Sequence, residues 1–294
     1  MVETVEEEEE QAEADTPKKF MPANDDVIFK LFFGDERNKE FLIGFLTSVL
    51  NLPINEYTDI EISDPHLKRE HTEDKLSILD VKVKTNTGKW INIEIQVSVN
   101  VPQEMRARIF YYTTKMTAGQ LKKGGRYRSI KRVISIVITG EILIPEHNEY
   151  HDMFIVNSPK TRVRFTDLLE IYTLELPKLP KETDGSDLYD WLGFIKASNE
   201  EELAMLAERS PQMKAPIEKL IELNQDEEAR MLFEAREKER RDMMEREEWA
   251  REEGELNKAF EIARKMLAKD KPIDEIIDFT GLSYEEIREL SIAN

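Results

Sequence analysis

Two acidic residues, Asp80 and Glu94, have the types and the spacing that best fit chemistry at a metal ion in this chain of 294 residues. They lie in two runs, 77–84 and 90–97, that alternate apolar and polar residues as half-buried strands do. The short loop between the runs ends in Gly88, which suits the left-handed last position of a three-residue hairpin loop. The pattern therefore predicts a β-hairpin with one acid on each strand.

The length of the loop predicts how the two strands pair. If the loop pairs Thr85 with Lys89, the residues before Thr85 pair one by one with the residues after Lys89. Asp80 then faces Glu94. Carboxylates directly opposite each other are destabilising, but a hard divalent cation between them turns the repulsion into a binding site. Gln96 lies on the same face, one strand repeat further on. The alternative is that both acids are solvent-facing polar residues of an ordinary hairpin.

The composition excludes several classes of function. There is no cysteine, so disulfides, thiol catalysis and cysteine-ligated zinc are ruled out. The formal net charge is −19, of which residues 1–16 contribute −8 and residues 200–256 contribute −9, leaving −2 for the remainder. A nearly neutral body remains compatible with a polyanionic partner.

The sequence predicts a cytoplasmic protein without a membrane span. It begins with a glutamate run, the opposite of the basic start of a signal peptide. No apolar run approaches the about 18–20 residues that cross a bilayer.

Helices and strands must position the two acids. The expected helices are 38–50, 104–121 and 187–198, and the expected strands, besides the hairpin, are 57–63, 132–139, 153–157 and 170–176. The run 132–139 is almost continuously apolar and is therefore expected near the centre of a sheet. This order predicts an α/β fold with a mixed central sheet flanked by helices.

We expect four regions along the chain, which are 1–20, a disordered acidic tail; 21–200, the α/β domain; 201–256, a long charged helical region; and 257–294, a small three-helix module. Within the third region, 217–256 has a helical pattern with a thin apolar seam. The last helix carries Glu285, Glu286 and Glu289, which argues against a DNA-recognition helix. We therefore expect the C-terminal helices to serve in packing, in regulation or in the formation of a homodimer.

Five short motifs occur in order along the chain, and they are Phe29-Lys30-x-Phe32-Phe33-Gly34, Leu79-Asp80-Val81, Asn92-Ile93-Glu94-Ile95-Gln96, Arg108-x-x-Tyr111-Tyr112 and Leu174-Glu175-Leu176-Pro177-Lys178. Together they resemble the Rpn / PD-(D/E)XK nuclease family transposases, the recombination-promoting nucleases of bacteria, over about residues 22–200. The resemblance implies a restriction-endonuclease-like core and Mg²⁺-dependent DNA cleavage that leaves a 3′-hydroxyl. Mn²⁺ is the alternative ion.

The same resemblance implies roles for individual residues. Asp80 and Glu94 would be metal ligands, the Ile95 carbonyl a third ligand, and Gln96 would orient the attacking water where the wider superfamily has lysine. Glu40 is expected to complete the site from the preceding helix. Further candidates for that position are Asp26 and Asp35. Each of these three acids alone is more simply an exposed charge.

Lysines near the acids offer a replacement for the missing superfamily lysine. Lys82 and Lys84 share the face of Asp80 if alternation holds. The alternative is that both lysines are ordinary solvated strand residues.

Basic and aromatic residues predict contacts to DNA. Arg108 and Tyr112 are i, i+4 neighbours on one helix face and could hold the DNA backbone, or else pair and pack within the core. A basic loop follows that helix, with Lys122, Lys123, Arg126, Arg128, Lys131 and Arg132. Binding there should weaken as salt rises, unless the loop is only a solvated surface.

The sequence leaves two other functions open. In the first, the nuclease fold is kept while catalysis is weak or lost, which gives a DNA-binding or protein-interaction module. The acidic N-terminus could instead mimic a phosphate chain over the basic loop and hold a nuclease inactive. His147 and His151 have zinc-like spacing, but no third ligand is evident.

Overall fold

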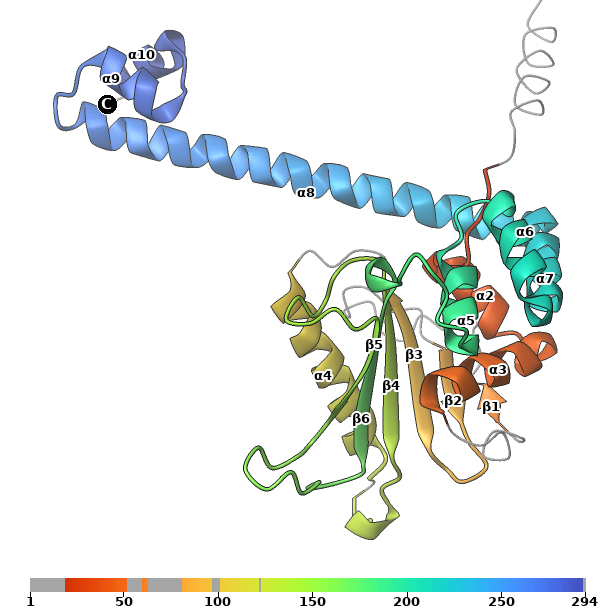
Figure 1. The fold of residues 1–294 in the computed structure, drawn as a ribbon. Helices are drawn as coiled ribbons and strands as arrows, with labels where there is room; N and C mark the ends of the chain where they lie inside the picture. Colours follow the sequence, from red (N-terminus) through yellow and green to blue (C-terminus); the bar gives the residue numbers. More distant parts are fainter. Residues whose placement is uncertain (1–18, 52–59, 63–80, 97–100, 122, 293–294) are drawn as a thin grey trace, which may run out of the picture. The chain divides into compact units, whose positions relative to one another are not determined.

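The structure is a computed structural model that describes residues 19–51, 60–62, 81–96, 101–121 and 123–292. Its centre is a six-stranded sheet in the order β1-β2-β3-β4-β6-β5 (Figure 1). The strands are β1 (Glu61–Ile62), β2 (Val81–Lys84), β3 (Trp90–Gln96), β4 (Val133–Thr139), β5 (His151–Ile155) and β6 (Leu169–Glu175). β3, β4 and β6 run parallel to one another, and the other neighbours are antiparallel. Helices flank this mixed sheet, which confirms the predicted α/β class.

The pairing of the hairpin strands is the one predicted from the loop length. Lys84 faces Trp90 at the turn, and Val81 faces Ile93 at the far end of the described ladder. The turn closes with Thr85 N–H donating to the carbonyl of Lys89 (3.0 Å). Asp80 lies outside the described residues.

Gly88 explains why this loop can be so short. It has a φ of +81°, a conformation that only glycine adopts without strain. Its N–H donates to the Thr85 carbonyl at 2.8 Å, which completes the turn. A side chain at this position would strain the turn that sets the register.

One face of the sheet carries the main hydrophobic core. Successive strand residues point to opposite faces, and Ile91, Ile93 and Ile95 of β3 all point to this one. The helices that cover it are α2 (Asp26–Phe33), α3 (Lys39–Leu50) and α5 (Asp187–Lys196). Phenylalanine rings of α2 and α3 pack against Trp191 and Phe194 of α5, which makes this layer rigid.

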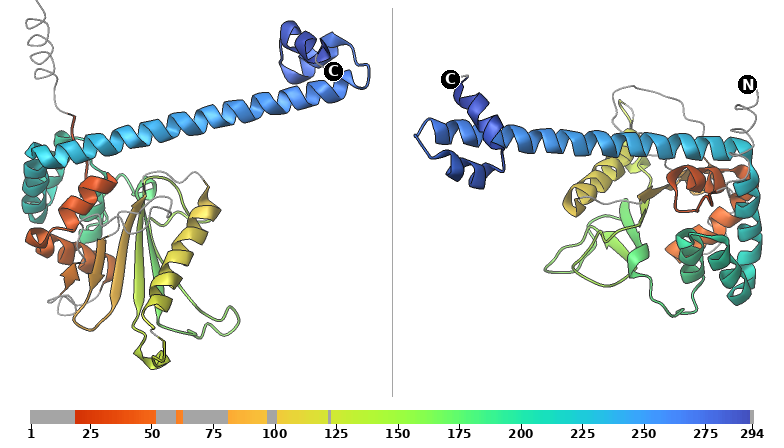
Figure 2. Two further views of the ribbon diagram at one scale, coloured as in Figure 1. Left: turned by 180° about the vertical axis from the view of Figure 1, so that it is seen from behind. Right: turned by 90° about the horizontal axis from the view of Figure 1, so that it is seen from above.

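The other face is covered by α4 (Pro102–Gly119), as Figure 2 shows from behind and from above. Met105 and Ile109 of α4 pack on Val137 of β4. The alternating pattern predicted a half-exposed β3, and this is wrong for its polar positions: Asn92 and Glu94 are buried too. The cause is that α4 covers this face of β3, which is also an interior strand of the sheet, between β2 and β4.

The main core continues past residue 200. It includes buried side chains of α6 (Glu200–Arg209) and α7 (Lys214–Gln225) and ends at Phe233. The start of the described chain is attached to α7 through Asn224. Its side chain accepts from Met21 N–H (2.7 Å) and donates to the Met21 carbonyl (3.0 Å), across 203 residues of sequence.

The chain divides into two compact units, residues 1–233 and 234–294. α8 (Glu227–Leu267) is one continuous helix of 41 residues, so the helical pattern expected over 217–256 is divided at Asp226 between α7 and α8, and α8 continues past it to Leu267. In the second unit, α9 (Ile273–Thr280) and α10 (Tyr284–Ile292) share a small core with the end of α8. The short 3₁₀ helices are η1 (Glu36–Asn38), η3 (Tyr127–Ser129), η4 (Leu176–Lys178) and η5 (Pro211–Met213).

A capping box opens α10. Ser283 N–H donates to Glu286 Oε2 (2.7 Å), and Glu286 N–H donates to Ser283 Oγ (3.3 Å). These reciprocal bonds satisfy amides that a helix start leaves open. Across the part of the chain that the structure describes, no helix combines the length and the apolar character needed to cross a membrane.

Candidate active site

Glu94 is a buried carboxylate near the carboxyl end of β3. It is only 1% exposed, and it points to the face of the sheet that α4 covers. Arg108 of α4 places Nη2 3.3 Å from Glu94 Oε1, and the arginine side chain is 28% exposed. The two residues form a charge pair with one partner in the interior and the other reaching toward solvent.

Burial changes the acidity of Glu94. It raises the pKa of the carboxyl group, while the positive charge of Arg108 and a hydrogen bond from the Gln96 side chain lower it, and the net direction is upward. Desolvation thus outweighs one arginine and one amide. The site therefore favours either a proton or additional positive charge beside Glu94.

The raised pKa predicts a pH dependence of stability. The folded protein keeps the Glu94 proton at pH values just above 4.5, the ordinary pKa of glutamate, where the unfolded chain has released it. Stability from this group is therefore present at low pH and is lost as pH rises through that window. We measure the melting temperatures of E94Q and of the wild type in EDTA at pH 4.5 and at pH 7.5. The difference between them should shift in favour of E94Q at the higher pH. Equal differences at both pH values would show that Glu94 is not the group that titrates.

Polar side chains from three parallel strands meet beside Glu94. Gln96 of β3, Thr139 of β4 and Glu175 of β6 are direct neighbours in register at the carboxyl ends of their strands. Ligands of open α/β sheets bind at this edge. Three buried oxygens on the same face have no hydrogen-bond partner within the described residues, namely Asn92 Oδ1, Thr139 Oγ1 and Thr173 Oγ1. Buried oxygens of this kind are expected to bind water or a ligand.

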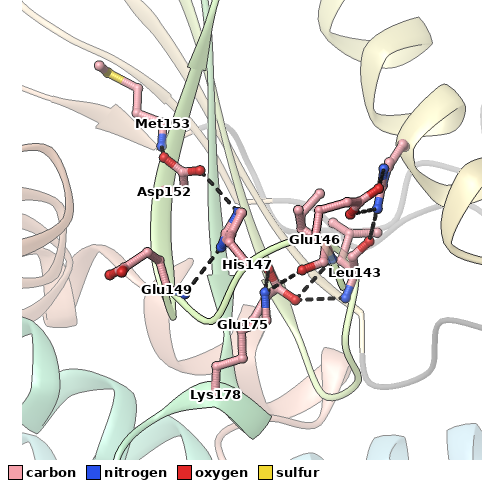
Figure 3. A network of polar contacts seen from close by, with 10 residues as sticks. Leu143, Glu146, His147, Glu149, Asp152, Met153, Glu175 and Lys178 are labelled. Atoms are coloured by element: carbon pink, nitrogen blue, oxygen red, sulfur yellow. Dashed lines mark hydrogen bonds and ion pairs between the residues drawn. The ribbon is translucent and has the colours of Figure 1, made fainter.

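A buried ion pair fixes the edge of the site beyond Thr139 (Figure 3). Glu175 Oε1 lies 2.8 Å from Lys178 Nζ, and both side chains are almost fully buried. The other oxygen, Oε2, accepts the backbone N–H groups of Leu143 (2.8 Å) and Ile144 (3.1 Å). Lys178 also donates to the Ile144 carbonyl at 2.6 Å. Glu175 Oε2 and Lys178 Nζ therefore both hold the loop after β4 in place.

Arg106 attaches the same loop to α4. Its guanidinium donates to the Leu143 carbonyl and pairs with Glu146 at 2.7 Å. Sequence reasoning gave no role to Arg106, Glu175 or Lys178. The signal for the last two was available, because they stand three residues apart inside a motif quoted for the resemblance.

Two predicted ligands are not joined to Glu94 by any described contact. Asp80 lies outside the described residues. Glu40 is exposed in the first turn of α3, whose helical layer covers the opposite face of the sheet. Within the described ranges no cluster of three or more His, Asp or Glu side chains could hold a metal ion. Glu94 and the Ile95 carbonyl thus remain the predicted ligands that the structure describes.

The two hairpin lysines differ in their surroundings. Lys84 pairs with Glu61 of β1 (3.1 Å) and is thereby neutralised. Lys82 is exposed and lies directly across from Asn92, on the face that carries Glu94. Lys82 is therefore the better placed of the two to supply positive charge near the site.

The predicted DNA contacts fall into two groups. Arg108 and half-buried Tyr112 lie on the flank of α4 that faces Glu94. The exposed residues Lys123, Arg126 and Arg128 lie at the opposite end of the sheet, where the loop approaches the hairpin turn at Gly88. The turn at Gly88 is roughly 20 Å from Glu94 along β3, at about 3.3 Å per residue. Lys122 lies outside the described residues.

Arg132 does not belong to the free basic surface. It pairs with Asp167 (2.9 Å) and with the buried carboxylate of Glu170 (3.4 Å). Arg164 contacts Glu170 as well, at 2.5 Å. Arg132 therefore neutralises acids at the start of β6. Lys123, Arg126 and Arg128, earlier in the loop, remain exposed to a polyanion.

The two histidines at zinc-like spacing have separate surroundings. His147 Nε2 lies 3.2 Å from Asp152 Oδ2 (Figure 3). His151 stacks on Tyr172, and burial lowers the pKa of its imidazole. They form no metal cluster with other described side chains.

Comparison with known proteins identifies the family of this chain. A family model described as PD-(D/E)XK nuclease family transposase matches residues 23–250. No curated protein and no solved structure matches the chain. The matched region contains β3, α4 and all the site residues described above.

Proposed function

Because the chain belongs to the PD-(D/E)XK nuclease family transposases, we propose that it is a DNA endonuclease that uses a divalent metal ion. The observation that carries the proposal is Glu94, a buried carboxylate with raised pKa at the carboxyl end of a parallel strand. A charge in such a place costs stability, and residues of this kind cluster at functional sites. The proposal keeps Asp80, which lies outside the described residues, as the second acid.

The donors around Glu94 fit a hard cation. Its carboxylate is paired with a single arginine, and the nearby Asn92 Oδ1 has no partner among the described residues. Glu94, Asp80 and the Ile95 carbonyl would hold the ion, all through oxygen atoms, as Mg²⁺ and Mn²⁺ prefer. When bound, Mg²⁺ supplies charge relief on the phosphate and makes a nearby water more acidic.

The protein side chains position the reaction. Gln96 hydrogen-bonds the attacking water and orients it toward phosphorus. The water oxygen forms a bond to phosphorus as the bond to the 3′-oxygen breaks, and a proton passes to that oxygen to leave a 3′-hydroxyl. Arg108, one part of which reaches solvent, neutralises the phosphate oxygens. Tyr112 holds the DNA backbone near the site, and the basic loop holds it further along, at the opposite end of the sheet.

The first test is cleavage of supercoiled plasmid with and without Mg²⁺. We expect nicked or linear product only with the ion, and loss of at least about 10²-fold in rate for D80N, because the variant lacks one of the two negative charges that hold the cation. Calorimetric titration with Mg²⁺ should show a site in the wild type that D80N lacks. Cleavage by D80N at the wild-type rate would contradict the metal assignment.

The alternative function is a nuclease fold with weak or lost catalysis that binds DNA or another protein. The Arg108–Glu94 pair supports it, since an arginine that stays in place would occupy the carboxylate. Absence of both cleavage and a Mg²⁺ site would favour this module.

A homodimer through the C-terminal helices is also proposed, on the exposed apolar residues Met244, Trp249 and Leu256 of α8.

A further inference from the structure

Two neighbouring tyrosines and a lysine form a small exposed cluster on α4. Tyr111 is 57% exposed, and its ring meets that of Tyr112 edge to face with centroids 5.3 Å apart. The ammonium of Lys115 lies 5.8 Å from the Tyr111 centroid and 5.9 Å from the Tyr112 centroid. Two contacts therefore hold a largely exposed ring in one orientation.

An exposed but oriented aromatic ring beside a cation has the chemistry of a base-stacking surface. Every nucleobase has a π-face that can stack on such a ring, and a cation next to it can pair with the adjoining phosphate. Bases inside a duplex already stack on each other and leave no face for a protein ring. The cluster therefore matches unpaired nucleotides better than paired ones.

The cluster is connected to the candidate active site by the helix itself. Arg108, which touches Glu94, precedes Tyr111 by three residues, or about 4.5 Å along a helix axis. Stacked nucleotides are spaced by about 3.4 Å per strand, so a base on Tyr111 would lie about one nucleotide from a phosphate at Arg108. Glu94 is only 1% exposed, so an unbent duplex does not contact it directly.

We propose that Tyr111, supported by Tyr112 and Lys115, is a stacking platform for an unpaired stretch of the DNA strand that enters the site. The substrate is then a single-stranded, looped or locally opened DNA rather than an intact duplex. This inference rests on the proposed nuclease function. It goes beyond it by assigning the class of DNA and the residue that selects it.

Binding of oligonucleotides in EDTA tests the platform without cleavage. Fluorescence anisotropy would compare labelled oligothymidylate with its oligoadenylate duplex of the same length. Loss of one base-stacking contact should weaken binding of the single strand about tenfold in Y111A, while binding of the duplex changes little. Y111F keeps the ring and should bind as the wild type does.

Phe110 provides a matched control on the same helix. It is 54% exposed, nearly as much as Tyr111, but its position lies on the flank of Arg106, away from Glu94. F110A should bind single strands as the wild type does. Tyr111 is exposed and alanine favours helices, so Y111A should also keep the wild-type melting temperature.

Three results would overturn the platform, namely unchanged binding of the single strand by Y111A, equal loss for single strand and duplex, or an equal loss in F110A. The nuclease proposal fails separately. If neither the plasmid nor single-stranded DNA is cut in the presence of Mg²⁺ but Y111A still loses single-strand binding, the platform stands and the catalytic function falls. If the plasmid is cut and Y111A binds normally, only the platform falls.

Discussion

E94Q is expected to lower the rate of DNA cleavage by about 10³-fold or more, because it removes the negative charge that would hold the metal ion. Glutamine has nearly the same shape, so the buried space stays filled and no cavity forms. Glu94 also carries a desolvation penalty at neutral pH, as its raised pKa indicates. The inactive variant should therefore be at least as stable as the wild type.

The measurement is the initial rate of plasmid nicking with Mg²⁺, together with a thermal unfolding curve for each protein. E104Q is the matched control, because Glu104 is an exposed glutamate in the first turn of the same helix that carries Arg108. It should cleave at the wild-type rate. An E94Q protein that keeps more than about a tenth of the activity would remove Glu94 from the chemistry.

K178M is expected to destabilise the protein by about 3–5 kcal/mol, because it leaves the buried carboxylate of Glu175 without its countercharge. Glu175 is fully buried, and Lys178 is only 6% exposed in its side chain. Methionine fills the lysine stem but cannot donate to the Ile144 carbonyl, a bond that is also lost. Urea unfolding of the full chain measures the change.

Lys219 and Glu222 provide the control for this pair. They too are a lysine and a glutamate at i, i+3 spacing in the same compact unit, but Lys219 is only half-buried and Glu222 is exposed. K219M should therefore change stability by less than about 1 kcal/mol. The double variant E175Q/K178M should recover most of the loss, since it removes the buried charge. A K178M midpoint equal to that of K219M would show that the pair does not stabilise the fold.

Local patterns predicted the parts of the fold that depend on neighbours in sequence. The loop ending in Gly88 sets the hairpin register, and the confirmed pairs follow from that turn alone. The apolar run of β4 predicted an interior strand, and it is buried along its whole length. In both cases the determining residues lie within a few positions of each other.

The surroundings of the site depend on distant segments and could not be predicted in the same way. Alternation assigns Glu94 to one face of the hairpin, but only the placement of β4 and α4 shows that this face is covered. The strand order, with β6 between β4 and β5, brings Glu175 beside Thr139 from a position 36 residues later in the sequence. The spacing of Thr139 and Glu175 in the sequence does not predict that they are neighbours in the sheet.

The attachment of Met21 to Asn224 makes the two ends of the first compact unit depend on each other. A ribosome must have released the chain past α7 before the N-terminal segment finds its partner, and past Phe233 before the core is closed. Contacts of such long range form late in folding. A polypeptide that ends before Asn224 would thus lack this attachment and leave part of the core uncovered, and proteases would degrade it as an unfolded chain.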